Sequence, residues 1–298
     1  MKSIIPLFFL LLFITNSIAQ NSPNADIHSH VCLKAFHSRH SLDYDNWDKV
    51  EHQCDGENVA GWMTGKSQGV PRYSQANLEA NALGNVRVLG WSITPLEKQY
   101  DNVRILNKKK KGIETMSCIA GITYQDFHFY NKGDVDYFPI LLENIEFVKY
   151  GQFKTRKING VDWSYELIKS KKHLEEIINS ENKIAGILNI EGANILGRSL
   201  IFDDMSKTPE YETMVLDNLL RLKGAKPLYD FKEEVLEYPI FSMGINHFFY
   251  NGLGGQANPF KPIQNFVFKG GKATGDPITP LGKKVIQSMI DNTNGRII

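Results

Sequence analysis

Strand-like and helix-like segments alternate along this chain, and the alternation limits the possible folds more than any other feature. Apolar or β-branched runs at 25–31, 86–94, 183–193 and 239–249 predict strands, and segments with helical spacing lie between and after them. Strands that alternate with helices are typical of a parallel sheet covered by helices. The sequence therefore predicts an α/β fold.

Five segments are predicted to be helices. Ser74 is the expected N-cap of the first, and Thr279 with Pro280 at the first helical position begins the last. A long excursion at about 95–165 is rich in Tyr, Phe, Lys and Asn and contains one of these helices. The predicted helices span 74–85, 135–150, 164–181, 211–224 and 279–295.

The first nineteen residues read as a cleaved signal peptide. Lys2 supplies a positive start, residues 4–14 form an apolar run too short to span a bilayer, and 17–19 offers small residues for cleavage. An uncleaved membrane anchor is the alternative interpretation. We expect export to a periplasmic or extracellular location, with no stable membrane span after cleavage.

Composition excludes some partners. The formal net charge is +1, so nothing indicates binding to nucleic acid or to an anionic membrane. The three cysteines, Cys32, Cys54 and Cys118, match no zinc-finger spacing. Export would permit one disulfide, of which Cys32–Cys54 is one option, but sequence alone does not determine the pairing.

The segment "ADIHSHV" (25–31) places Asp26, His28 and His30 at alternate positions. In an extended strand these side chains point to one face, so the two imidazoles can share a metal ion. Asp26 would then be a supporting group that orients an imidazole. The alternatives are a pair of structural or surface histidines and a simple charge at the strand edge.

Two further strand ends carry ionisable groups. Glu191 ends the apolar run "AGILNIEGA", and a buried carboxylate there is costly unless it is paired. Its two oxygens could bridge two cations, although a salt bridge at the sheet edge would also explain it. His247 lies in "INHFFYNGLGG", either as a core histidine or as a group that contacts substrate. Parallel sheets bind ligands at their carboxyl ends, where these groups would converge.

Four segments together resemble the membrane dipeptidase family, the renal-dipeptidase-like metallopeptidases of the amidohydrolase superfamily. The resemblance covers about 24–298 and is diffuse between the motifs. It implies a partial TIM (β/α)8-type metal-dependent hydrolase barrel of about four to five strands over 20–298. The segments are "ADIHSHV", "NIEGANIL", "INHFFYNGLGG" and "ITPLGKKVIQSMI".

The resemblance also implies roles for single residues. His28 and His30 would be ligands of one metal ion, Glu191 would bridge two Zn²⁺ ions, and His247 would contact the substrate. The implied activity is metal-dependent hydrolysis of dipeptides or related small amides, with a small-molecule peptide as substrate. No residue of this chain is assigned as the catalytic base.

Two departures from the family qualify this picture. Many members have Asp where this chain has His30, and the family places further His ligands and a catalytic Asp after the position of Ile298. The final "RII" reads as a fifth strand just beginning, so we expect the N-terminal part of a longer barrel. Such a part alone should bind metal weakly, if at all, and show little activity.

Two other functions stay open at this point. A non-catalytic exported barrel fragment would bind a ligand or partner without chemistry. A metal-dependent phosphoesterase of the polymerase-and-histidinol-phosphatase type also begins with an H-x-H strand. The "IEGAN" and "TPLGKKV" segments argue against the phosphoesterase.

Overall fold

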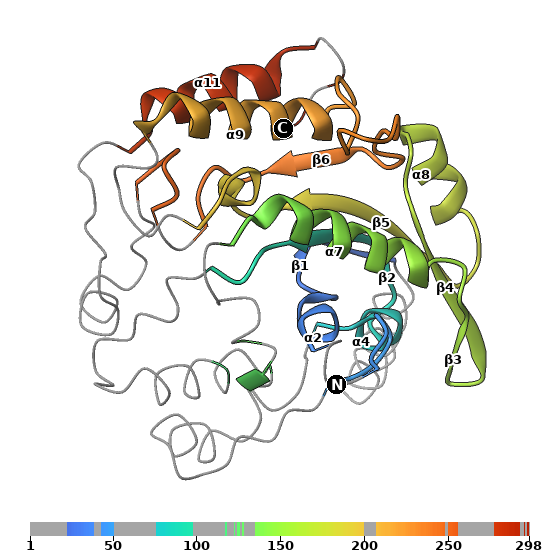
Figure 1. Ribbon diagram of the computed structural model, residues 1–298. Coiled ribbons are helices and arrows are strands. Elements are labelled where there is room, and N and C mark those ends of the chain that lie inside the picture. The colour runs from blue at the N-terminus through green and yellow to red at the C-terminus, as the bar shows by residue number, and fades with distance from the viewer. Residues whose placement is uncertain are drawn as a thin grey trace, which may run out of the picture.

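A computed structural model describes most of the chain between Pro23 and Asn292 (Figure 1). The predicted signal peptide at 1–19 lies outside the described residues, as do Cys54 and Cys118. The described residues are 23–38, 43–50, 76–97, 135–199, 207–247, 250–255 and 277–292, with 117, 122, 124, 125, 127, 295 and 297.

Four parallel strands lie side by side in the order in which the chain forms them. The arrows of β5 and β6 point the same way in Figure 1, so their carboxyl ends share one edge. The described strands form an open sheet, and the predicted α/β arrangement is confirmed. The four strands are β1 (Asn24–Ser29), β2 (Val86–Ile93), β5 (Lys183–Ile190) and β6 (Ile240–Met243).

The strand β5 is the centre of the sheet. Along one edge it pairs with β2, from Val88 opposite Ala185 to Ile93 opposite Ile190. Along its other edge it pairs first with β4 and then, from Leu188 onward, with β6. Most of its side chains are buried, as expected of a parallel strand covered on both faces.

An antiparallel hairpin makes the sheet mixed. Its strands are β3 (Arg156–Ile158) and β4 (Val161–Leu167), and β4 continues as a parallel neighbour of β5. The turn consists of Asn159 and Gly160, both with positive φ (49° and 81°). Asn-Gly is the preferred pair for such a turn, so the hairpin had a sequence signal that the periodicity analysis missed.

The prediction of one helix over 164–181 is therefore wrong in its first part. Trp163, Tyr165 and Leu167 alternate with more exposed residues and point into the core, which is strand periodicity. Only the second part is helical, as α8 (Lys171–Ile178), and Ser170 caps it by accepting a hydrogen bond from the His173 N–H.

The other helices agree with the sequence in place but not always in their ends. The first predicted helix begins after Asn77, whose side chain accepts from the Ala80 N–H, so the expected cap at Ser74 is wrong. The last is capped by Thr279 as predicted but ends at Ile290. These four helices are α4 (Leu78–Leu83), α7 (Tyr137–Gly151), α9 (Pro209–Leu222) and α11 (Pro280–Ile290). A short helix that the sequence did not predict, α2 (Leu33–His37), follows β1.

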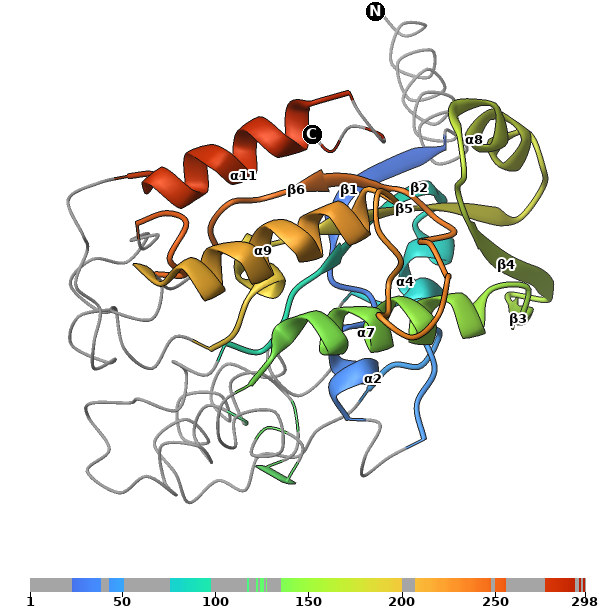
Figure 2. The same ribbon diagram turned by 45° about the horizontal axis from the view of Figure 1, so that its top comes forward.

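The helices cover the sheet and one another. α9 and α11 lie side by side in both views (Figures 1 and 2), α4 packs on β2, and α8 packs on β5. Within the described parts of the chain, no helix combines the length and apolar character needed to cross a bilayer.

The core ties α7 to the sheet through Tyr165. Its ring packs against that of Trp91 with centroids 4.8 Å apart, and both residues are completely buried. The Tyr165 hydroxyl donates to the Val148 carbonyl on α7 and accepts from the Asn46 amide at 2.9 Å. Burial raises the pKa of this hydroxyl, so it remains a neutral donor.

Cys32 is a free, buried thiol. Its Sγ donates to Asn144 Oδ1 at 3.3 Å, and burial raises its pKa to about 12. The option of a Cys32–Cys54 disulfide is therefore not realised. A thiol of this kind is protonated and inaccessible, so it is a packing residue and not a nucleophile.

Of the final predicted strand at 296–298, only Ile297 is described. Ile297 is buried in the core, and its N–H donates to the Met289 carbonyl at 3.1 Å. This hydrogen bond holds Ile297 against the end of α11.

The strand β1 approaches β2 unusually closely at Gly90. A Cβ at this position would lie 2.1 Å from the Ile27 carbonyl oxygen and 2.8 Å from Asn189 Nδ2. The β1–β2 register shifts between Asp26 and Ser29, so this contact sits inside an irregularity of the strand. Because Ile27 immediately precedes His28, the absence of a side chain at Gly90 also sets the position of that histidine.

We expect Gly90→Ala to lower the free energy of unfolding by about 1–3 kcal/mol, since the atoms that block the new methyl group are backbone. The matched control is Gly84→Ala, where the nearest atom is the Ala80 carbonyl oxygen at 3.4 Å. That control should change the stability by less than about 1 kcal/mol. Urea unfolding of both variants measures the difference, and equal stabilities would contradict the close approach.

Candidate metal centre

Four adjacent parallel strands deliver ionisable side chains to one edge of the sheet. His28 and His30 lie at the end of β1, Glu97 follows β2, Glu191 directly follows β5, and His247 follows β6. The structure thus brings together all the residues predicted as metal ligands and the predicted substrate contact. The arrangement is that expected of the carboxyl edge of a parallel sheet.

One oxygen of Glu191 faces both histidines of β1. Glu191 Oε2 lies 3.5 Å from His28 Nε2 and 2.8 Å from His30 Nε2. The two rings meet edge to face, with centroids 5.1 Å apart. One ligand atom from each of the three residues lies within 4.8 Å of the others, which is close enough to hold a single metal ion.

The orientation of His30 is fixed by its second nitrogen. His30 Nδ1 lies 3.0 Å from the Ser92 carbonyl oxygen, which can only accept, so Nδ1 carries a hydrogen. In a neutral ring Nε2 then presents a lone pair to Glu191 Oε2. Two lone pairs facing each other require a positive charge between them, either a proton or a metal ion. Metal-ligating histidines commonly donate their other N–H to a carbonyl in this way.

The position of Glu191 follows from β5. Its N–H donates to the Ile93 carbonyl at 2.8 Å, so the β2–β5 pairing extends to this residue. Gly192 then turns the chain away with a φ of +94°. Burial raises the pKa of the Glu191 carboxyl, but the hydrogen bond from His30 and the charges of the three histidines outweigh it and lower the pKa.

Asp26 does not contact an imidazole among the described interactions. Its Oδ1 accepts from the main-chain N–H of His28 at 3.1 Å. The contact braces the strand just before the first histidine, which is a support of the backbone and not of a ring.

His247 is held by a residue that the sequence analysis missed. His247 Nδ1 lies 2.9 Å from Glu97 Oε1, and Glu97 is only 3% exposed. Burial lowers the pKa of His247, but the hydrogen bond and charge of Glu97, with the charge of Glu191, outweigh it and raise the pKa. Glu97 had one signal: it is a carboxylate just beyond the end of a predicted strand.

His247 also approaches the group formed by His28, His30 and Glu191, here called the histidine–glutamate cluster. Its Nε2 lies 3.9 Å from Glu191 Oε1, the oxygen not shared by His28 and His30. A Cβ at Gly192 would lie 2.7 Å from His247 Cβ and 2.4 Å from Asn194 Oδ1. Glycine therefore allows His247 and the short helix η2 (Ala193–Leu196) to pack close to Glu191.

The loop after β6 is held by hydrogen bonds within itself and by one from the residue that caps α11. The buried Asn251 donates from Nδ2 to the Ile245 carbonyl, and its Oδ1 accepts from the N–H groups of Leu253 and Gly254. The Thr279 hydroxyl, which caps α11, donates to the Gly252 carbonyl at 2.8 Å. These bonds fix the segment that carries His247.

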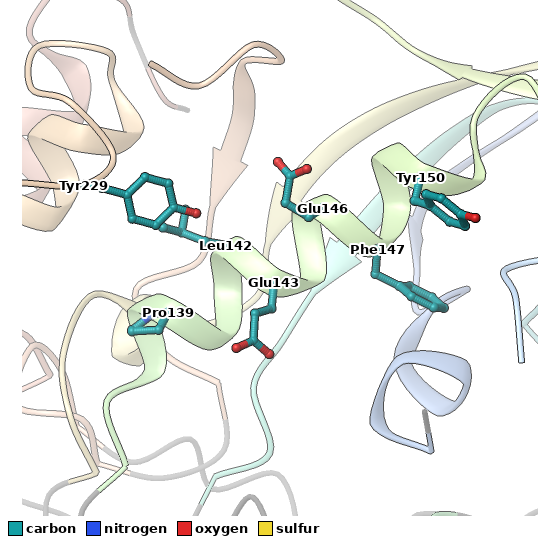
Figure 3. A pocket seen from close by; sticks show the side chains of 7 residues that line it. All are labelled: Pro139, Leu142, Glu143, Glu146, Phe147, Tyr150 and Tyr229. Carbon is teal, nitrogen blue, oxygen red and sulfur yellow. The ribbon is translucent and has the colours of Figure 1, made fainter. Parts of the chain in front are cut away.

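A separate hollow lies on the surface of α7, with Tyr229 beside it (Figure 3). None of its lining residues belongs to the histidine–glutamate cluster, so the two features are independent. The hollow is lined by Pro139, Leu142, Glu143, Glu146, Phe147, Tyr150 and Tyr229.

Comparisons with protein-family models, curated proteins and solved structures gave no match to this chain.

The raised pKa of His247 predicts a pH-dependent contribution to stability. A group whose pKa is higher in the folded state stabilises the fold below its ordinary value, near 6.5, and loses that contribution as the pH rises through the folded value. We therefore expect the stability difference between the wild type and His247→Gln to be largest at acidic pH and to shrink toward pH 9.

Urea unfolding in the presence of a chelator, at several values between pH 5.5 and pH 9, measures this difference. The control is His173→Gln, because His173 lies on α8 and contacts Glu166 outside the cluster. A difference for His247→Gln that is constant or grows with pH would contradict the assigned interaction with Glu97.

Proposed function

We propose that this chain is part of a metal-dependent hydrolase that cleaves dipeptides or related small amides. The observation that carries the proposal is the position of Glu191 Oε2, which lies within 3.5 Å of His28 Nε2 and 2.8 Å of His30 Nε2. The Ser92 carbonyl orients His30 as a metal ligand is usually oriented. The resemblance to the membrane dipeptidase family assigns the same residues to metal binding.

The donor set fits zinc. Two imidazoles and one carboxylate are a common set in catalytic zinc sites, which keep a further position open for water or substrate. These residues could hold a cation, which would supply Lewis-acid chemistry and lower the pKa of a water ligand to about 7. Glu191 Oε2 is the oxygen that meets the two histidines of β1. A second, bridged Zn²⁺ is part of the proposal and would need donors beyond these three residues.

His247 supports hydrolysis from the other side of Glu191. With Nδ1 committed to Glu97, its Nε2 is the nitrogen available to a substrate. A protonated Nε2 can donate to a substrate carboxylate or to the oxygen that becomes negative when an amide carbonyl is attacked. Such preorganised donors supply a large part of the rate enhancement in acyl-transfer enzymes.

The arrangement of strands supports the barrel implied by the resemblance. With the β3–β4 hairpin set aside, β1, β2, β5 and β6 neighbour one another in chain order, as successive strands of a (β/α)8 barrel do. We propose that the chain forms part of such a barrel and that its substrate is a small peptide. Export after signal cleavage belongs to the same proposal.

Metal binding is the first test. Zn²⁺ added to chelator-treated protein should raise its melting temperature, with about 2.7 kcal/mol of added stability at a hundredfold excess over Kd. Glu191→Gln should abolish the shift, because a neutral amide is a poor zinc ligand. Glu175→Gln is the matched control, since Glu175 is an exposed carboxylate on α8. An equal shift in both variants would contradict a site at Glu191.

Hydrolysis is the second test. The zinc-loaded chain is assayed with Gly-Leu and with a phosphomonoester, and His30→Ala is compared with His173→Ala. We expect dipeptide cleavage, weak if further ligands are needed, that His30→Ala lowers by a hundredfold or more and His173→Ala preserves. Cleavage of the phosphomonoester alone would favour a phosphoesterase. Zinc binding with no hydrolysis would favour a non-catalytic protein.

A further inference from the structure

We propose that Glu97 is a positioning residue, which fixes the ring orientation and tautomer of His247 so that Nε2 faces the space beside Glu191. This inference rests on the proposed function for its chemical consequence. Its structural part concerns only the contact between Glu97 and His247, which lie 150 positions apart in the sequence.

The contact leaves one arrangement of the imidazole. Glu97 Oε1 lies 2.9 Å from His247 Nδ1, and the Glu97 side chain is 97% removed from solvent. A carboxylate oxygen accepts and cannot donate, so the ring nitrogen at this distance is the donor. Turning the ring over would place a C–H group against Oε1 and remove that donor. Nδ1 therefore carries a hydrogen that points at Glu97.

The second nitrogen, Nε2, makes no hydrogen bond to another described residue, so it can meet a substrate. His247 Nε2 lies 3.9 Å from Glu191 Oε1, which is too far for a hydrogen bond. In the charged ring Nε2 also carries a hydrogen, and a substrate oxygen placed beside Glu191 could come within hydrogen-bond distance of it. This is the position that a donor to the developing negative charge must occupy.

The location of Glu97 explains why it can hold this orientation. β2 and β6 pair with opposite edges of β5, so Glu97 and His247 come from the two strands that flank Glu191. Their hydrogen bond joins the two strands across the end of β5. The Glu97–His247 pair therefore fixes the imidazole relative to the strand that carries the metal-ligating carboxylate.

The structural part is tested by ¹⁵N NMR of protein labelled at histidine, with the His247 signals identified by their loss in His247→Ala. In the wild type, at a pH where the ring is neutral, we expect its one N–H to be on Nδ1. Glu97→Gln should preserve this, because the amide oxygen still accepts. Glu97→Ala should lose it, and so should Glu97→Asp, whose oxygen is withdrawn by one methylene group.

A bare Nδ1 in the wild type, or unchanged His247 signals in both Glu97→Asp and Glu97→Ala, would overturn the inference. Glu97→Asp keeps the charge, so the comparison stands even if Glu97→Ala fails to fold. These measurements need neither zinc nor substrate, so they decide the role of Glu97 even if the chain proves not to be a hydrolase.

The kinetic part uses the zinc-loaded chain and Gly-Leu. We expect Glu97→Ala to lower kcat about tenfold or more with little change in KM, and Glu97→Gln to restore most of the loss. Added to His247→Ala, the Glu97→Ala change should have no further effect, because a positioning residue acts only through its partner. An independent, additive loss would overturn the inference.

Discussion

The pairing of β5 with three other strands is the constraint on which the rest of the structure depends. β2 fixes one edge, β4 and β6 share the other, and the pairing with β2 continues into the main chain of Glu191. The carboxylate therefore leaves the sheet from a backbone held by hydrogen bonds, not from a mobile loop. Gly192 then turns the chain within one residue, which keeps Glu191 at the edge of the sheet.

The ionisable side chains of the candidate site lower the stability of the fold relative to apolar packing. Glu97 is buried and Glu191 is half-buried beside three histidines, and placing charged groups there costs more than apolar packing would. Each carboxylate contacts at least one imidazole: Glu97 contacts that of His247, and Glu191 contacts those of His28 and His30. A core with apolar residues at these positions would be more stable. Under the proposed function, a bound cation or substrate would account for this arrangement.

Periodicity and strand ends were enough to predict the parallel sheet and the proximity of His28, His30, Glu191 and His247, because parallel strands align their carboxyl ends. Glu97 was not predictable in its role, since its partner is 150 residues away and no local pattern marks such a pair. The segment 164–181 failed for another reason. Its second half is polar and charged and has strong helix character. The predicted helix was therefore begun too early and included the alternating residues of β4.

The two oxygens of Glu191 divide the site into two sides. Oε2 is directed at His28 and His30, whereas Oε1 is directed at His247, whose ring is held by Glu97. A cation on the first side and a hydrogen-bond donor on the second would act on opposite sides of one carboxylate. A substrate carbonyl beside Glu191 could then be polarised from the first side and receive a hydrogen bond from the second. In the proposed reaction this second side requires a fixed donor, and the deeply buried Glu97 would hold the imidazole that follows β6 in that position.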